Sequence, residues 1–357
     1  MKILILGSGQ SFHATRWANA LSEKGLEVGF VTVHKIIRHL NDDISVFELS
    51  NNRGLGYILD VFKLKKVLAT FKPDILHIHF STGYGLLGKL SGYPTRIVSV
   101  YGTDIYDFPN KSIFHKKLLE FNLNGAKQIL STSESMADEF LKHYKNKFNR
   151  PIVTPFGVDI KKFKPLDKDK KDLSVIKIGL VKKLEKKYGI STLIKSFALL
   201  VKELPKYKFS LEIGGGGSQL EYLQQLSKEL DIEKLVTFHG WMDNSKVPDF
   251  FNNLDICVIP SESESESFGV AAVEAQACGI PVIVSNVGGL PEVVKENVTG
   301  LVFPVENVKI LVETMKKLSV DKELRITLGK GGRKRVKELY DWDKNVDFMI
   351  KIYGETI

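Results

Sequence analysis

Cysteine is scarce in this chain. It occurs only twice, as Cys257 and Cys278, and this pair has neither the spacing of a zinc site nor the number needed for a disulfide framework. So few cysteines in 357 residues indicate a reducing compartment, and we expect a cytoplasmic protein. No long hydrophobic run is present either, because Gly7 and Gly9 interrupt the opening run well before the ~18 apolar residues that a membrane span needs. MKILILGSG therefore predicts a first strand.

The excess of positive charge is moderate and does not select a partner by itself. A net charge of +9 fits nucleic acid, an anionic membrane surface or an anionic ligand. The sequence has no zinc-finger spacing, helix-turn-helix signature or RNA-binding aromatic motif, which disfavours nucleic acid. We expect no nucleic-acid partner and favour peripheral contact of a basic face with anionic lipid.

Short apolar runs alternate with amphipathic stretches along the chain. The first series runs from KILILG to QILSTS, and a second series begins at VIKIGL and continues to PVIVSN. This alternation predicts βαβ units with parallel sheets, an α/β fold. The charged, apolar-poor segment 161–174 is typical of a linker and places a domain boundary near residue 165. We predict an N-terminal domain over 1–165 and a C-terminal domain over 166–339.

The tail, residues 340–357, has Trp342, Val346, Met349 and Tyr353 at helical spacing. It predicts an amphipathic helix. The residues alone leave open whether this helix packs on the C-terminal domain or crosses back to the N-terminal domain.

The stretch PSESESESFGVAAVEAQACGIPVIVS, residues 260–285, carries the clearest chemistry. It predicts a strand end, a polar loop and then a helix that opens at Phe268 and Gly269. Backbone N–H groups at such a helix start bind anions. Glu266 and Glu274 flank it, separated by at most ~12 Å of helix rise, and paired carboxylate oxygens suit the vicinal hydroxyls of a sugar. Glu262 and Glu264 are interpreted as part of a solvated acidic loop.

This segment resembles the E-x7-E signature of the family 4 retaining glycosyltransferases (glycosyl transferases group 1). The resemblance covers nearly the whole chain and also includes, in order, PFGVD, IGGGG, FHGWM, GGLPEVV and NVTGLVF. It implies a GT-B fold with two Rossmann-like domains facing across a cleft, the donor bound by the C-terminal domain and the acceptor by the N-terminal domain. It also implies that the tail helix crosses back, and that no metal or other cofactor is required.

The resemblance assigns roles to the residues of the motif. Glu266 is similar to the ligand of the donor sugar and Glu274 to the ligand of the ribose, while the backbone of Ser267, Phe268 and Gly269 approaches the donor. Family members also hold the diphosphate with two cations. Lys187 best matches the second cation, although Tyr188 separates it from Gly189, and either Lys182 or Lys183 supplies the first. Cations there stabilise the charge of the leaving diphosphate.

Further donor contacts follow from the resemblance at two turns. Gly214 and Gly215 of IGGGG match donor-site glycines, and Trp241 and Met242 of FHGWM fall where the family seats the nucleotide base. Gly9, in the loop after the first strand, is a candidate contact to the diphosphate.

In the N-terminal domain, His13 and Arg16 are candidate acceptor contacts. Asp104 matches an acidic position common in the family, with a predicted catalytic role beside Glu266 and Lys187. Tyr101 stands where many members have a histidine near the reacting sugar. His77 and His79 share one face of a strand; one of them, here His79, is a candidate for the cleft, although satisfied core histidines remain the alternative.

The predicted reaction is transfer of a hexosyl or N-acetylhexosaminyl group from a nucleotide diphosphate sugar to a glycan or lipid-linked acceptor of envelope polysaccharide synthesis. Uridine is the expected base of the donor, because the resemblance makes a UDP-linked sugar the commoner one. Retention is pictured as front-face displacement, in which the leaving phosphate accepts the proton of the acceptor. Three alternatives stay open: a nucleotide-sugar-binding protein without turnover, another GT-B enzyme such as an epimerase or phosphorylase, and a Rossmann oxidoreductase. The last is disfavoured because no G-x-G-x-x-G follows either opening strand.

Overall fold

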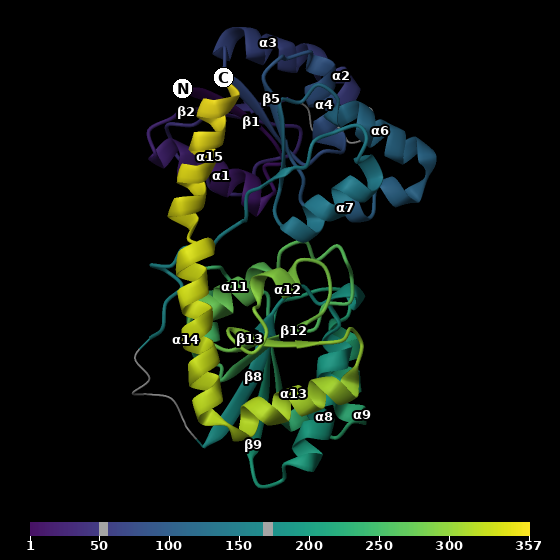
Figure 1. The fold of residues 1–357 in the computed structure, drawn as a ribbon, viewed down its shortest axis with the longest axis vertical. Coiled ribbons are helices and arrows are strands. Elements are labelled where there is room, and N and C mark those ends of the chain that lie inside the picture. The colour runs from purple at the N-terminus through teal and green to yellow at the C-terminus, as the bar shows by residue number, and fades with distance from the viewer. Residues whose placement is uncertain (50–55, 167–173) are drawn as a thin grey trace. The chain divides into compact units, whose positions relative to one another are not determined.

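The computed structural model describes residues 1–49, 56–166 and 174–357. The chain forms two compact units, which Figure 1 shows with their elements labelled. The N-terminal unit consists of Met1–Phe156 together with Asp343–Ile357, and the C-terminal unit is Gly157–Trp342. Each unit is a parallel β-sheet with helices packed on it, which confirms the predicted α/β class.

The N-terminal unit contains a seven-stranded parallel sheet in the order β3-β2-β1-β4-β5-β6-β7. The strands are β1 Lys2–Leu6, β2 Glu27–Thr32, β3 Ser45–Glu48, β4 Ile75–His79, β5 Arg96–Ser99, β6 Gln128–Ser131 and β7 Ile152–Val153. Strands β1 and β4 are buried along nearly their whole length, as expected for continuous apolar runs in a parallel sheet. The strand order reverses between β1 and β4, which is where open α/β sheets usually bind ligands.

Helices connect these strands and supply the other half of the core. They are α1 Phe12–Glu23, α2 Gly56–Leu59, α3 Val61–Phe71, α4 Gly83–Ser91, α5 Thr103–Tyr106, α6 Ile113–Leu123 and α7 Glu134–Tyr144. Leu64, Leu68 and Phe71 of α3 show the helical spacing that buries one stripe. Ser11, Ser112 and Ser133 each cap the helix that follows them through a side-chain oxygen.

The C-terminal unit repeats the same topology with six parallel strands in the order β10-β9-β8-β11-β12-β13. The strands are β8 Val175–Val181, β9 Lys208–Gly214, β10 Val236–Gly240, β11 Ile256–Ile259, β12 Val282–Ser285 and β13 Gly300–Phe303. Its helices are α8 Ile190–Glu203, α9 Leu220–Glu229, α10 Val247–Asn252, α11 Val270–Ala277, α12 Leu290–Val293, α13 Val308–Val320 and α14 Lys322–Leu339. Here the order reverses between β8 and β11, so this edge of the sheet is the expected ligand edge.

The boundary between the units falls at 156/157, earlier than the predicted position near residue 165. The segment that follows Phe156 is tied to the C-terminal unit. The N–H of Val158 donates to the carbonyl of Tyr340 over 2.7 Å, and the guanidinium of Arg333 donates to the carbonyls of Ile160 and Phe163. These hydrogen bonds join residues far apart in sequence, which composition cannot reveal. Half of the predicted linker, residues 167–173, lies outside the described residues.

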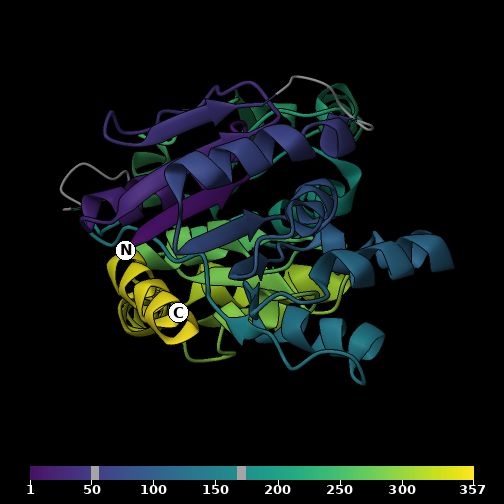
Figure 2. The ribbon, with the colours of Figure 1, turned by 90° about the horizontal axis from the view of Figure 1, so that it is seen from above.

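The tail helix α15, Trp342–Thr356, packs on the N-terminal unit, as the family resemblance implies. Val346, Met349 and Tyr353 are buried in this contact. The Tyr353 hydroxyl lies 2.6 Å from Nδ1 of His77 in β4. The Nε2 of His77 lies 2.8 Å from the Ser99 hydroxyl, so both ring nitrogens are satisfied. The two chain ends consequently lie close together on this unit, as both views show (Figures 1 and 2).

Tyr353→Phe is expected to lower the free energy of unfolding by ~1–3 kcal/mol, because it leaves a buried nitrogen of His77 without its partner. Urea unfolding measures the change. Tyr207→Phe is the matched control, since Tyr207 is exposed. Equal effects of the two substitutions would contradict a stabilising role for the contact.

Candidate active site

The loop between β11 and α11 brings the predicted motif residues to the ligand edge of the C-terminal sheet. Glu266 and Ser261 are both buried in this loop. The Ser261 hydroxyl donates a hydrogen bond of 3.0 Å to Oε2 of Glu266. The same oxygen lies 2.5 Å from Nζ of Lys182, the first residue after β8. The side chains of Lys182 and Glu266 are only 15% and 8% exposed, so this ion pair is largely shielded from water.

This contact distinguishes the two lysines that the sequence could not separate. Lys182 points into the site, whereas Lys183 is exposed. The Nζ atoms of Lys182 and Lys187 lie 4.6 and 5.2 Å from the centroid of the Tyr188 ring. Cations near an aromatic face are attracted by its quadrupole, so Tyr188 contacts both ammonium groups. The side chain of Lys187, unlike that of Lys182, is exposed. The backbone of Lys187 is fixed, since its carbonyl accepts from the N–H of Glu262.

Helix α11 begins with an amino end that no side chain caps. Its N-cap is Gly269, with φ of +89°, and a Cβ there would lie 2.6 Å from Leu290. The first N–H groups of a helix lack intrahelical partners and carry partial positive charge. Phe268, in contrast, is buried and packs edge to face on Tyr340, so its side chain belongs to the core. Ser267 is also buried.

Glu274 lies one turn into α11 and is half-buried. Burial, and after it the charge of Glu274, raises the pKa of Cys257 in β11 and of Cys278 above the usual thiol range. The charge of Lys182 acts on Cys257 in the opposite direction. The charges of Glu274 and Lys182 therefore both act on the buried thiol of Cys257 inside β11.

The glycine-rich loop after β9 packs directly on the lysine segment. The N–H of Lys182 donates to the carbonyl of Gly214, and the N–H of Gly215 donates to that of Gly240. Gly215 has φ of +125°, and a Cβ there would lie 1.8 Å from the Lys182 carbonyl oxygen. The close approach of two backbones thus requires glycine at this position. Next to this loop, Met242 is half-buried and Trp241 is 72% exposed.

Gly288 and Gly289, the paired glycines of the GGLPEVV motif, hold the Glu266 loop in place. The N–H of Gly289 donates to the carbonyl of Glu266, and the N–H of Gly288 donates to the carboxylate of Glu264. Glu262 accepts from the Thr192 hydroxyl over 3.0 Å. Glu262 and Glu264 therefore fasten the loop, beyond the solvated role predicted for them. The GGLPEVV motif was the available signal, because paired glycines often mark close backbone approach.

The N-terminal unit has a cavity of about 270 Å³ at the ends of β1, β2, β4 and β5, beside the reversal of strand order. None of the described residues that line it carries a fixed charge. They are Ser8, Ser11, Ala14, His34, Tyr57, His79, Phe80, Thr82, Gly83, Tyr84 and Tyr101. Tyrosine, histidine and hydroxyl side chains predominate, so the cavity offers hydrogen bonds and aromatic faces.

The predicted acceptor residues divide between this cavity and its surroundings. His79 and Tyr101 line the cavity and are hydrogen-bonded to each other through Nδ1 and the hydroxyl. Burial holds the pKa of His79 well below its usual value, so its ring is neutral, and its Nε2 has no hydrogen-bond partner among the described residues. His13 instead stacks on Phe156, with ring centroids 3.7 Å apart. Arg16 lies over the ring of Phe12.

Asp104 and Gly9 are engaged within their own unit. The fully buried Asp104 carboxylate accepts from the N–H and hydroxyl of Ser81 and from the N–H groups of Tyr101 and Gly102. Burial nevertheless raises the pKa of Asp104. Asp104 thus positions the loop that carries Tyr101, and its predicted catalytic role stays a prediction. The N–H of Gly9 donates to Thr32 Oγ1 over 3.0 Å.

Within the described residues, no group of three or more His, Cys, Asp or Glu side chains is arranged to hold a metal ion. In that same part of the chain, no helix combines the length and the apolar composition that crossing a bilayer would require.

Comparison with known proteins matches each of the two units to a glycosyltransferase family model. The family model "Glycosyl transferases group 1" matches residues 160–335, and "Glycosyl transferase 4-like" matches residues 2–133. A D-inositol 3-phosphate glycosyltransferase of Corynebacterium jeikeium is 30% identical over 217 residues, which are 57% of this chain. That match covers 51% of the relative, so the chain spans about half the length of this relative.

Two further proteins match along nearly the whole chain. The N-acetyl-alpha-D-glucosaminyl L-malate synthase of Bacillus anthracis is 26% identical over 374 residues, covering 98% of this chain and 94% of that protein. The structure of Anabaena HepE in complex with UDP has a TM-score of 0.84 at 17% identity, covering 99% of this chain and 100% of HepE. At such low identity the structural likeness concerns the fold.

Proposed function

Because the chain belongs to the glycosyl transferases group 1 and has the two Rossmann-like units of the GT-B class, we propose that it is a retaining, metal-independent enzyme that uses a UDP-linked sugar. Family membership makes it a glycosyltransferase that acts on nucleotide sugars in glycan synthesis. The finer proposal is that it moves a hexosyl or N-acetylhexosaminyl group to a glycan or lipid-linked acceptor of envelope polysaccharide synthesis.

The observation that carries this proposal is the shielded contact of Lys182, Glu266 and Ser261 beside the uncapped start of α11. It puts a cation, a carboxylate and helix N–H groups together at the ligand edge of one sheet. A sugar diphosphate presents negative phosphate oxygens beside hydroxyl groups. The cation and the N–H groups match the phosphates, and the carboxylate matches the hydroxyls.

Each side chain then has one role. Lys182 and Lys187 hold the diphosphate, and the amine of each contacts the Tyr188 ring. Glu266 accepts hydrogen bonds from the donor sugar, and Glu274 from the ribose. The nucleotide base lies by the turn that contains Trp241 and Met242. Uridine is the proposed base because HepE, of the same fold, was seen with UDP.

The mechanism follows from the charge that develops in transfer. As the bond from the sugar to the diphosphate breaks, negative charge grows on the leaving oxygen, and fixed cations stabilise that charge more than they stabilise the intact donor. The leaving phosphate oxygen takes the proton of the incoming hydroxyl on the same face of the sugar, which retains the configuration. No side chain then has to act as a base, and no metal has to balance the charge.

The acceptor enters the cavity of the N-terminal unit. Its described lining has no fixed charge and offers tyrosine rings and hydroxyl groups, which suit the faces and hydroxyls of an uncharged sugar. The acceptors named for the inositol phosphate and malate relatives are anionic. A glycan acceptor fits this cavity better than either.

Glu274→Ala is expected to remove most of the thermal stabilisation that UDP gives to the wild-type protein. At about one hundred times its Kd, a ligand stabilises by ~2.7 kcal/mol, which raises Tm by several degrees. Loss of the ribose contact removes most of that shift. Glu338→Ala, at an exposed position of α14, is the matched control and should keep the full shift. The measurement is a thermal-shift series with UDP, GDP and ADP.

Transfer assays with UDP-sugars and simple glycosides separate the alternatives. Transfer with retained configuration supports the proposal. Tight UDP binding without transfer or hydrolysis on any acceptor would favour a binding protein, and isomerisation of the free donor would favour an epimerase. A shift with GDP or ADP but not UDP would overturn the proposed base.

A further inference from the structure

Helix α6 carries large apolar side chains on the face that points away from its own unit. Ile113 is 70% exposed, Phe114 68% and Phe121 44%. The buried face of the same helix already packs Leu119 and Leu123 into the core. A helix that is apolar on two sides is usually covered on both. Among the residues that the structure describes, Ile113 and Phe114 remain mostly exposed on this outer side, and Phe121 is partly covered.

Lysines surround these apolar groups. Lys111 and Lys117 are exposed, and Lys117 falls between Phe114 and Phe121 at helical spacing. The amine of Lys89 lies 5.4 Å from the ring of Phe121. Such stems cover aromatic rings while their charged ends stay in water. The acidic groups close by are the exposed Asp107 and the half-buried Glu120, and Glu120 is already paired with Lys147 at 2.5 Å.

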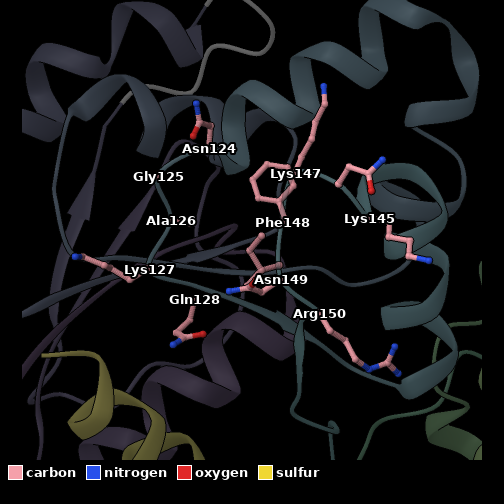
Figure 3. A pocket seen from close by; sticks show the side chains of 12 residues that line it. Asn124, Gly125, Ala126, Lys127, Gln128, Lys145, Lys147, Phe148, Asn149 and Arg150 are labelled. Carbon is pink, nitrogen blue, oxygen red and sulfur yellow. The ribbon is translucent and has the colours of Figure 1, made fainter.

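A basic recess begins where α6 ends. It is lined by residues 124–129 and 145–150 and has a volume of about 490 Å³. Figure 3 shows the side chains around it. Lys127 and Lys145 line it, and in the described part of the chain neither has a side-chain hydrogen bond or ion pair. Arg150 is paired with Glu134 and Asp138. The amine of Lys89 donates to the carbonyl of Asn124 at the rim, which links the recess to the apolar side of α6.

We propose that this α6 surface, made of Ile113, Phe114, Lys117 and Phe121 together with Lys127 and Lys145 of the recess, docks on a membrane rich in anionic phospholipid. The apolar side chains enter the boundary between headgroups and acyl chains, and the amines bind lipid phosphates. Charge complementarity selects this occupant, because cations flank the apolar groups and the unpaired lysines of the recess suit phosphate. A fluid lipid surface also needs no matching shape, unlike a folded protein partner. The inference goes beyond the proposed reaction and does not depend on it.

The test is co-sedimentation of the full chain with vesicles of phosphatidylcholine alone or mixed with phosphatidylglycerol, without donor or acceptor. Wild-type protein should bind the mixed vesicles, and binding should fall as salt rises. The double variant Ile113→Glu with Phe114→Glu should lower the partition coefficient at least ~tenfold, because two apolar side chains no longer enter the lipid. Val320→Glu, an exposed apolar position of the C-terminal unit, is the matched control and should bind like wild type.

Three results would overturn the proposal: no binding of wild type to the mixed vesicles, equal binding by the double variant, or equal binding to phosphatidylcholine alone at all salt concentrations. Both substituted positions are exposed, so the variant should keep the wild-type Tm and circular dichroism spectrum. Lys127→Glu with Lys145→Glu tests the recess separately and should lower binding to the mixed vesicles. Binding of UDP is read from thermal shift, so failure of the reaction and failure of membrane docking are told apart.

Discussion

Lys182→Ala is expected to lower kcat/KM for the sugar donor by ~10²–10³-fold, the range found when a fixed group that stabilises transition-state charge is removed. The structure supplies the reason, because the Lys182 amine lies at the ligand edge of the sheet, shielded from water and 2.5 Å from the Glu266 carboxylate. A cation in such a place acts strongly on a leaving diphosphate, since little solvent screens it. Steady-state kinetics with the UDP-sugar that is transferred in the assays above measures the effect.

Lys183→Ala is the matched control for this experiment. Lys183 has the same chemistry one position further along, but its side chain is exposed. We expect its loss to change kcat/KM by no more than ~threefold, as for a screened surface charge. Equal losses in the two variants would show that Lys182 has no special role. Lys182→Arg keeps the charge and should recover part of the activity, which separates lost charge from a disturbed loop.

Much of the fold follows from the sequence because its signals are local. Apolar runs such as KILIL became buried central strands, and the restart of the rhythm at VIKIGL marks the second sheet. Val346, Met349 and Tyr353 are at helical spacing and are the buried face of α15. Each of these predictions needs only the period of apolar residues within one element.

The site was predictable as a set of motifs but not as a geometry. The sequence left open whether Lys182 or Lys183 supplies the first cation of the site. The answer depends on which of the two side chains faces Glu266 at the end of β8. Asp104 looked catalytic, yet its carboxylate is occupied by hydrogen bonds from Ser81, Tyr101 and Gly102. Such contacts join separate strands, and the pattern of one strand carries no information about its neighbour. The domain boundary at 156/157 was misplaced for the same reason, because it depends on hydrogen bonds between residues far apart in the sequence.

The glycine-rich loop gives a second large effect that the sequence alone would have assigned to ligand contact. Gly215 adopts a φ of +125°, which side chains rarely allow, and an added Cβ would lie 1.8 Å from the carbonyl oxygen of Lys182. That atom is backbone and cannot rotate away. Its neighbour Gly216 has nothing within 4 Å of an added Cβ and no positive φ. The two adjacent glycines thus form an internal comparison of strained and open positions.

Gly215→Ala is expected to lower the free energy of unfolding by ~2–4 kcal/mol, through the forbidden backbone conformation and the clash together. Because relief of the clash must displace the backbone of Lys182, the variant should also lose most of the UDP-induced thermal shift. Gly216→Ala should change stability by no more than ~0.5 kcal/mol and keep the shift. Urea unfolding and thermal shift on the same samples measure both quantities. If Gly215→Ala stayed as stable as Gly216→Ala but lost UDP binding, the glycine would serve ligand contact rather than backbone packing. If it lost stability but bound UDP normally, the position of the Lys182 backbone would not matter for the donor, and the central contact of the proposed site would have to be reassigned.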